Sequence, residues 1–279
     1  MNLGVNVPNF GAGTDPDRLR AWAQTVEGLG FDLLMLSDHV VVTPDVAAQY
    51  PAPFYEPFTA LAWLAGLTRR VRLGTTVLIA GHRHPLLVAR MAANLDRLSG
   101  GRLVLGVGAG WARQEFAALG APFERRGALT GELLRTLRSA WADTGDYQAG
   151  QIPLWVGGHS DAALRRAVRY GDAWHPLRFT MPWFEETLDR LKTIAEAEDR
   201  PVPALAPRVL LRLTDEPPAE RRAGEGTLDQ VLSDLEHLRR LGAEDVLLDP
   251  FVGDPDETLR PETAWHALAA VAAHRKELA

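Results

Sequence analysis

Apolar segments of strand length alternate with segments of helical periodicity along this 279-residue chain. Eight segments have the length and apolar character of buried strands, and they span residues 3–7, 31–36, 71–79, 102–107, 152–156, 173–175, 208–213 and 245–249. The helical segments span residues 16–29, 56–67, 85–98, 112–141 with a break near Pro122, 161–170, 182–198, 228–241 and 261–276. This alternation predicts a parallel sheet with right-handed crossovers, and eight strand–helix units close into a (β/α)8 barrel, the TIM barrel.

Several of the predicted helices have capping residues at their ends. Thr14 or Asp15 precedes a proline at one helix start, Ser160 stands at an N-cap position, and Gly30 and Gly242 follow two helix ends. No change of composition marks a domain boundary, so we expect residues 1–279 to form a single α/β barrel domain.

A doubly wound open sheet is the alternative fold. The segment Gly106-Val-Gly-Ala-Gly110 has some likeness to a dinucleotide-binding fingerprint. It lacks the GxGxxG spacing, however, and it follows the fourth predicted strand, whereas that fingerprint usually follows the first. The barrel is therefore the favoured prediction.

The composition is that of an ordinary globular protein, with 46% hydrophobic and 24% charged residues. The 30 basic and 36 acidic residues are interspersed and give a net charge of −6, so we expect neither nucleic acid nor a membrane as partner. No stretch approaches about 18 uninterrupted apolar residues and no signal peptide is evident, from which we expect a cytoplasmic protein. The absence of cysteine excludes disulfides, thiolate zinc sites and a cysteine nucleophile.

A cluster of glycines follows the fourth predicted strand, in the segment Arg102-Leu-Val-Leu-Gly-Val-Gly-Ala-Gly-Trp111. Its apolar residues form the continuous run that a strand buried on both faces requires. Gly106, Gly108 and Gly110 then remove side chains where a flat or phosphorylated molecule could approach the backbone. The segment is either a cofactor-binding loop or a simple glycine turn.

Polar residues stand at the ends of the second and third predicted strands, where a barrel places its functional groups. Asp38 and His39 end the second strand and supply a hydrogen-bond partner and a group that titrates near neutrality, although Asp38 could simply cap a loop. His82 and His84 after the third strand have the spacing of a metal site. We expect no metal there, because the sequence places no third ligand near them.

The segment Trp155-Val-Gly-Gly-His-Ser-Asp161 after the fifth strand leads directly into a helix. Two glycines followed by serine at a helix start leave unpaired backbone N–H groups at the positive end of the helix dipole. This pattern predicts a phosphate-binding turn, and the alternative is a capped strand–helix connection. Trp174 and His175 at the sixth strand end add an aromatic wall and a second candidate proton donor.

The segments together resemble the luciferase-like monooxygenase superfamily, and within it the coenzyme F420-dependent (deazaflavin) oxidoreductases. The matching segments are Asp38-His-Val40, Leu73-Gly-Thr75, His84-Pro-Leu86, Leu95-Asp-Arg-Leu-Ser-Gly-Gly-Arg102, Leu105-Gly-Val-Gly-Ala-Gly-Trp111, Glu115-Phe116, Ala118-Leu-Gly120, Pro122-Phe-Glu-Arg-Arg-Gly127 and Pro153-Leu-Trp-Val-Gly-Gly158. The resemblance is dense over residues 1 to about 180 and looser beyond.

The resemblance implies a luciferase-like (β/α)8 barrel that binds a flavin or deazaflavin, with a non-prolyl cis peptide against the ring. It assigns catalysis to Asp38 and His39, with Asp38 also at the edge of the ring. The cofactor-binding residues that it implies are Asp38, Thr76 and Val77 with the cis bond between them, Gly108, Ala109, Gly110, Gln114, Gly157, Gly158, His159 and Ser160. Trp111, which stands where some sugar-phosphate dehydrogenases of this group have a glutamate, and His175 would contact the substrate.

These expectations favour an oxidoreductase that transfers a hydride between coenzyme F420 and a small, apolar or aromatic substrate. An FMN-dependent monooxygenase that uses oxygen and reduced flavin is the alternative. A cofactor-binding protein without turnover is the second alternative. The expected partners are the small-molecule substrate, a second copy of the chain in a homodimer, and a flavin or F420 reductase as electron source.

Overall fold

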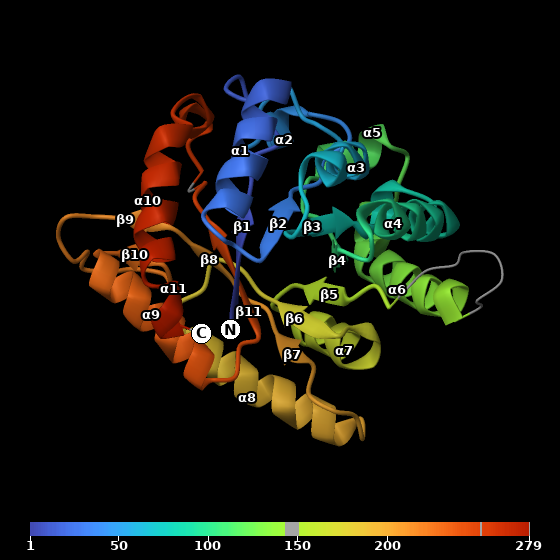
Figure 1. The fold of residues 1–279 in the computed structure, drawn as a ribbon. Helices are drawn as coiled ribbons and strands as arrows, with labels where there is room; N and C mark the ends of the chain where they lie inside the picture. Colours follow the sequence, from blue (N-terminus) through green and yellow to red (C-terminus); the bar gives the residue numbers. More distant parts are fainter. Residues whose placement is uncertain (143–150, 252, 279) are drawn as a thin grey trace.

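The computed structural model describes residues 1–142, 151–251 and 253–278, and its centre is a closed parallel sheet. Helices surround the strands on the outside, and the two chain ends lie near each other (Figure 1). The strands follow the order β7-β6-β5-β4-β3-β2-β1-β11-β8, and every pair is parallel. Their bounds are β1 (Asn2–Asn6), β2 (Leu33–Leu36), β3 (Arg72–Ile79), β4 (Leu103–Gly108), β5 (Leu154–Gly157), β6 (Ala173–His175), β7 (Ala204–Leu205), β8 (Arg208–Leu210) and β11 (Asp245–Asp249).

The barrel closes through a seventh strand that is broken in two. β7 pairs with β6, β8 pairs with β11, and Pro207 lies between the two pieces. Proline has no N–H to donate to a strand ladder, which interrupts the regular pairing there. Hydrogen bonds still cross the break on both sides, from Ala206 N–H to the Trp174 carbonyl and from Leu247 N–H to the Pro207 carbonyl. The predicted (β/α)8 barrel is thus confirmed.

The helices match the sequence pattern closely. Those on the barrel exterior are α1 (Pro16–Gly28), α3 (Pro57–Leu67), α4 (Pro85–Ser99), α6 (Arg126–Ala142), α7 (Asp161–Tyr170), α8 (Met181–Ala197), α9 (Leu228–Arg240) and α10 (Pro261–Ala273). The shorter ones are α2 (Pro44–Ala47), α5 (Arg113–Ala118), α11 (Arg275–Leu278) and the 3₁₀ turns η1 (Ala80–His82), η2 (Phe123–Arg125) and η3 (Pro255–Leu259). The predicted break near Pro122 falls between α5 and α6. Asp15 and Ser160 are the N-caps of α1 and α7, as predicted.

Alternate residues of each strand face two separate apolar layers. Leu33 and Met35 of β2 pack inside the barrel with Val104 and Trp155, whereas Leu34 and Leu36 face the helices. This two-sided burial explains why the strands are continuous apolar runs.

The seventh predicted strand, residues 208–213, needs a correction. The strand begins earlier, with β7, and it ends at Leu210, because residues 212–213 leave the barrel as β9 (Arg212–Leu213) and pair with β10 (Glu225–Gly226). The prolines at 201, 203 and 207 make the start of this strand indistinguishable from a loop in the sequence. No described helix is long and apolar enough to cross a membrane.

Candidate active site

A cavity of about 450 Å³ opens at the carboxyl ends of the barrel strands. Volumes of this order are typical of sites for small molecules and cofactors. The predicted residues Asp38, His39, Thr76, Val77, Gly108, Ala109, Gly110, Trp111, Gly157, Gly158, His159, Ser160 and His175 all line it. It is also lined by residues that the sequence analysis did not single out, among them Tyr50, Arg126, Arg166 and Arg208.

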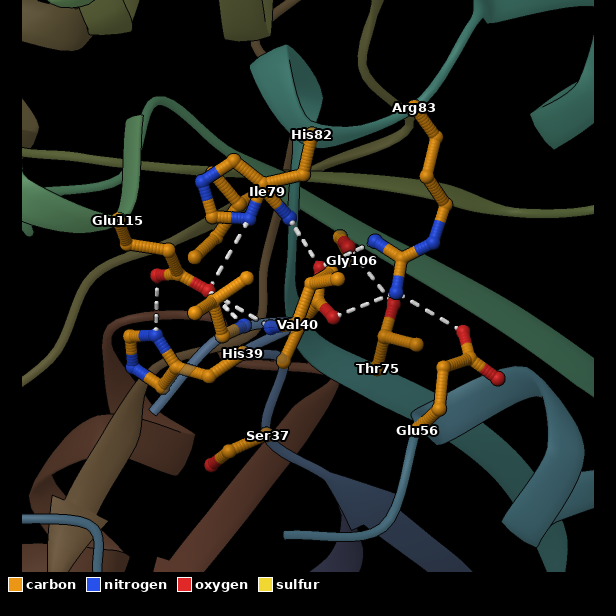
Figure 2. A network of polar contacts seen from close by, with 12 residues as sticks. Ser37, His39, Val40, Glu56, Thr75, Ile79, His82, Arg83, Gly106 and Glu115 are labelled. Atoms are coloured by element: carbon orange, nitrogen blue, oxygen red, sulfur yellow. Dashed lines mark hydrogen bonds and ion pairs between the residues drawn. The ribbon is translucent and has the colours of Figure 1, made fainter. Parts of the chain in front are cut away.

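His39 and Glu115 form a buried pair at one end of this cavity. The Nδ1 atom of His39 lies 2.6 Å from Oε2 of Glu115, and both side chains are almost completely buried (Figure 2). The Nε2 atom of His39 has no hydrogen-bond partner among the described residues, and it is not enclosed by protein. His39 therefore presents one nitrogen to the cavity while Glu115 fixes the orientation of the ring.

Backbone groups hold the carboxylate of Glu115 in place. Its Oε1 atom accepts hydrogen bonds from the N–H groups of Val40 at 2.6 Å and Val41 at 3.1 Å (Figure 2). Burial raises the pKa of Glu115, but hydrogen bonds from His39 and Val40 and the adjacent imidazoles outweigh it, so the pKa lies below its usual range. The carboxylate engages Nδ1 of His39 and leaves Nε2 directed to the cavity, where it can exchange a proton with a bound molecule.

A second imidazole stands on the other side of the same carboxylate. Nδ1 of His82 lies 3.6 Å from Oε1 of Glu115, and the ring packs against Phe116. Burial lowers the pKa of His82 despite the nearby carboxylates. His84, by contrast, is exposed and its Nδ1 accepts from the Leu86 N–H at the start of α4. Among the described residues no cluster of three His, Cys, Asp or Glu side chains has the arrangement of a metal site.

Asp38 is engaged by the protein itself. Its two oxygens accept hydrogen bonds of 2.8 Å from the guanidinium of Arg83, and one also accepts from the Ile79 N–H at 2.9 Å. Arg83 extends from there to Glu56 at the start of α3 (Figure 2). Asp38 thus ties the end of β2 to the end of β3, and its direct contact with a cofactor stays a prediction.

The peptide bond between Thr76 and Val77 is cis, as the resemblance implies. The Val77 side chain then lies over the end of β4, where a Cβ added to Gly108 would come within 2.4 Å of Val77 Cγ2. Glycine at position 108 is therefore a packing requirement of β3. This contact gives the fourth-strand glycine cluster a structural reason beside its predicted role under a cofactor.

The opposite end of the cavity is suited to an anion. The N–H groups of His159 and Ser160 donate to no other described residue, and Gly158 has a φ of +119°. Arg126 and Arg166 also line this end, and neither forms an ion pair within the part of the chain that the structure describes. Burial lowers the pKa of Arg166, and its Nε atom is buried without a partner. Two cationic side chains and free N–H groups at a helix start form an anion-binding arrangement.

His175 is occupied on both ring nitrogens. Nδ1 contacts the Ala206 carbonyl at 2.5 Å, so this nitrogen carries the proton, and Nε2 accepts from the hydroxyl of Thr76 at 2.9 Å. Burial lowers the pKa of His175 to about 4. Arg208 donates to the carbonyl and the hydroxyl of Thr76 and forms a buried ion pair with Asp249 of β11. His175 lines the cavity as predicted, but this network leaves it neutral with no free proton to donate.

Aromatic rings enclose the His39 end of the cavity. The ring of His39 lies 5.3 Å from Tyr50, 5.4 Å from Phe54 and 5.8 Å from Trp111, between ring centres. Trp111 is 44% exposed, so it lies at the mouth of the cavity. A molecule next to His39 would meet mainly apolar surface, which is consistent with an apolar or aromatic substrate.

The structure does not bring Gln114 to this cavity. Its side chain accepts from the Asp45 N–H at 3.4 Å on the outside of α5, one position before the buried Glu115. Sequence reasoning missed the partners of His39, namely Glu115 and Tyr50, and both cavity arginines. Glu115 and Arg126 did fall in segments that carry the family resemblance, which was the available signal.

A larger cavity, of about 730 Å³, lies beside the first under α10. Its walls include Trp22, Leu211 and Phe251 with charged residues of both signs, and none of the predicted site residues lines it. The smaller cavity is therefore the candidate active site.

Comparisons with known proteins give a consistent result. A sequence model of the luciferase-like monooxygenase family matches residues 1–223. The phthiodiolone/phenolphthiodiolone dimycocerosates ketoreductase of Mycobacterium tuberculosis is 30% identical in an alignment of 229 residues that covers 70% of this chain and 59% of that protein. The chain thus spans about 60% of the length of the curated relatives that it matches.

Two solved structures share the fold over nearly the whole chain. The monooxygenase RslO1 of Streptomyces bottropensis has a TM-score of 0.77 at 21% identity, covering 98% of each chain. The coenzyme F420-dependent tetrahydromethanopterin reductase of Methanopyrus kandleri has a TM-score of 0.72 at 16% identity, covering 98% of this chain and 97% of that one. At these identities the likeness shows the fold alone.

Proposed function

The chain belongs to the luciferase-like monooxygenase family, and we propose that it is an oxidoreductase that transfers a hydride between coenzyme F420 and a small apolar or aromatic substrate. The family consists of oxidoreductases and monooxygenases, which supports an enzyme. The observation that carries the proposal is one cavity that joins an anion-binding end to the His39–Glu115 pair.

The residues present fit a flavin-type cofactor. Gly158 leaves space where a Cβ would come within 2.7 Å of the Ala163 Cβ, and the unpaired Nε of Arg166 marks a position for an acceptor oxygen. The phosphate would be held by Arg126, Arg166 and the N–H groups of His159 and Ser160. Val77 and the glycines of β4 would support the ring.

When bound, F420 supplies two-electron hydride chemistry, and the protein supplies position and proton transfer. His39 gives a proton to the substrate from Nε2 when the substrate is reduced, and takes it back in the reverse direction. Glu115 holds Nδ1–H and stabilises the imidazolium. The aromatic rings around His39 exclude water from the reacting atoms.

An FMN-dependent monooxygenase is the second candidate, and the two arginines favour it. A terminal phosphate monoester carries a charge of about −1.5 to −2 at neutral pH. FMN ends in such a group, whereas the phosphate of F420 is a diester with a single charge. Arg126 and Arg166 together would match the greater charge of the monoester.

The test is a pair of calorimetric titrations of the purified protein, one with F420 and one with FMN. We expect F420 to bind, and the loaded protein to oxidise reduced F420 in the presence of a substrate without consuming oxygen. Binding of FMN alone, with oxygen consumption coupled to a flavin reductase, would establish the second candidate. Binding without turnover on a broad panel would point to a non-catalytic cofactor-binding protein.

A further inference from the structure

Tyr50 is a cavity-lining residue whose hydroxyl has no partner among the described residues. It follows α2 in the loop before α3, and it lines the same cavity as His39. Within the described residues its hydroxyl makes no hydrogen bond, and the oxygen is not enclosed by protein. The hydroxyl is therefore open to the cavity and can form a hydrogen bond with a bound molecule.

The ring of Tyr50 is held firmly by its neighbours. It packs edge-on against Phe10 at 4.9 Å between ring centres and contacts Phe251 at 5.9 Å. Phe10 and Phe251 are both almost fully buried, and the Tyr50 backbone N–H donates to the Val46 carbonyl at 2.8 Å. The position of Tyr50 beside His39 is thus fixed by core residues.

Tyr50, His39 and Trp111 are neighbours that line the same cavity. Their ring centres lie 5.3 Å apart for His39 and Tyr50, 5.8 Å for His39 and Trp111, and 6.5 Å for Tyr50 and Trp111. His39 Nε2 and the Tyr50 hydroxyl have no partner in the described part of the chain; the hydroxyl can donate, and Nε2 donates when the ring carries a second proton. The surroundings of the two donors are otherwise apolar, since Asp38 is neutralised by Arg83 and Glu115 lies behind His39.

We propose that the Tyr50 hydroxyl and His39 Nε2 together bind the oxygen of a neutral carbonyl or alcohol substrate. The proposal rests on the proposed function and narrows its substrate to a ketone, an aldehyde or the corresponding alcohol with an apolar body. In the reducing direction a bound reduced cofactor would supply the hydride that forms the C–H bond at the carbonyl carbon. The C=O π bond would break and the oxygen would take the proton of His39 Nε2, which leaves the cofactor oxidised and the His39 ring neutral. Tyr50 keeps its proton and stabilises the developing negative charge.

The test compares two probes of similar shape, acetophenone and α-methylstyrene, which differ in having oxygen or CH₂ at one position. Binding is measured by calorimetry, without turnover. The protein is first loaded with F420 or FMN, whichever it binds; if it binds neither, the protein alone is used. We expect the wild type to prefer the ketone. Tyr50→Phe should weaken ketone binding about fivefold, the value of one hydrogen bond, and leave hydrocarbon binding unchanged.

Tyr55→Phe is the matched control, because Tyr55 does not line the cavity. Unchanged cofactor affinity and unfolding temperature in Tyr50→Phe show that the packing against Phe10 is intact. The proposal is overturned if the wild type binds both probes equally or binds neither, or if Tyr50→Phe binds the ketone as tightly as the wild type. If neither cofactor binds, the proposed function is overturned. The comparison of the two probes on the protein alone still tests the role of Tyr50.

Discussion

At the scale of single residues, Glu115 decides what His39 can do. The carboxylate accepts from His39 Nδ1 and from two backbone N–H groups, so it has little tendency to take a proton. In this position the carboxylate would stabilise positive charge that forms on the His39 ring during proton transfer. The catalytic property therefore belongs to the pair and not to His39 alone.

Glu115→Gln should lower turnover while cofactor affinity changes little. The amide cannot supply the negative charge, and its single oxygen can accept either from the Val40 and Val41 N–H groups or from His39 Nδ1, so one of these contacts is lost. We expect kcat to fall by roughly 10²- to 10⁴-fold, as it does when a general acid is lost. The kcat of His39→Ala should fall by a similar factor. Steady-state kinetics across pH 5 to 9 measure this. Glu124→Gln, at an exposed ion pair with Arg113, is the control. Near-normal kcat in Glu115→Gln would contradict the assignment.

His175 makes the stability of the protein depend on pH. Its pKa of about 4 in the folded protein lies below the ordinary value of 6.5, so the unfolded chain binds the proton more readily. Stability is therefore complete above pH 6.5 and falls as the pH drops towards 4. The shift corresponds to about 2 kcal/mol lost between pH 8 and pH 5.

His175→Gln should remove that contribution, because glutamine can still bond to Thr76 and Ala206 but does not titrate. Urea unfolding of both proteins at pH 8 and pH 5 gives the comparison. The variant should lose less free energy of unfolding than the wild type on acidification. Equal losses would mean that other groups, such as His82, account for the acid sensitivity.

At the scale of elements, the turn between β5 and α7 combines two requirements. Gly158 has a positive φ, and its Cα faces Ala163 closely enough to exclude a side chain. Only glycine meets both conditions without strain. The free N–H groups of His159 and Ser160 depend on this turn.

Gly158→Val should weaken cofactor binding by about 10-fold or more, or ~1.4 kcal/mol, because the branched side chain displaces the turn. Titration of the folded variant with F420 and FMN measures the change. Gly66→Val in α3, where an added Cβ meets open space, serves as the control. If Gly158→Val binds as tightly as the wild type, the anion is held elsewhere.

The sequence predicted most elements within two or three residues, because continuous apolar runs and capping residues are local signals. The prediction of the seventh strand included β8 but missed β7, because the pairing of this strand depends on β6 and β11, which are distant in the chain. In the site, too, residues marked by local signals were predicted and partners distant in the chain were not. His39 and Gly158 stand at strand ends and were predictable, whereas the partner of His39 lies 76 positions away. Gln114 and Glu115 are neighbours on α5, and periodicity alone could not tell which one is buried beside His39.

At the scale of the whole molecule, a buried polar network joins the strands where the barrel closes. Arg208 of β8 bonds to Thr76 of β3 and to Asp249 of β11, and Asp249 accepts from Asn6 of β1 at 2.9 Å. His175 of β6 joins through Thr76. This network lies inside the cavity mouth, so the same residues support the fold and the site.

Arg208→Met should destabilise the protein by about 3–5 kcal/mol, because Asp249 would be left as an unpaired buried charge. Arg239→Met, which breaks an exposed pair with Glu236 within α9, should leave the free energy of unfolding nearly unchanged, because an exposed ion pair is screened by solvent. Urea unfolding at pH 7 measures both. A loss in Arg208→Met no greater than in the surface control would show that the network is not structural.

The homodimer, the reductase partner and the cytoplasmic location stay predictions. They are to be checked by the mass of the particle in solution, by pull-down and by fractionation, respectively.

Val77 also restricts how this chain can vary over evolutionary time. Its side chain fills the space over Gly108, so a larger residue at 108 can be accepted only with a smaller one at 77. The two positions, on different strands, are expected to show epistasis: either substitution alone is harmful, while the pair is tolerated. A mutant library meant to reshape this cavity would therefore have to randomise both codons together, since scanning one site at a time would discard each single substitution at positions 77 and 108.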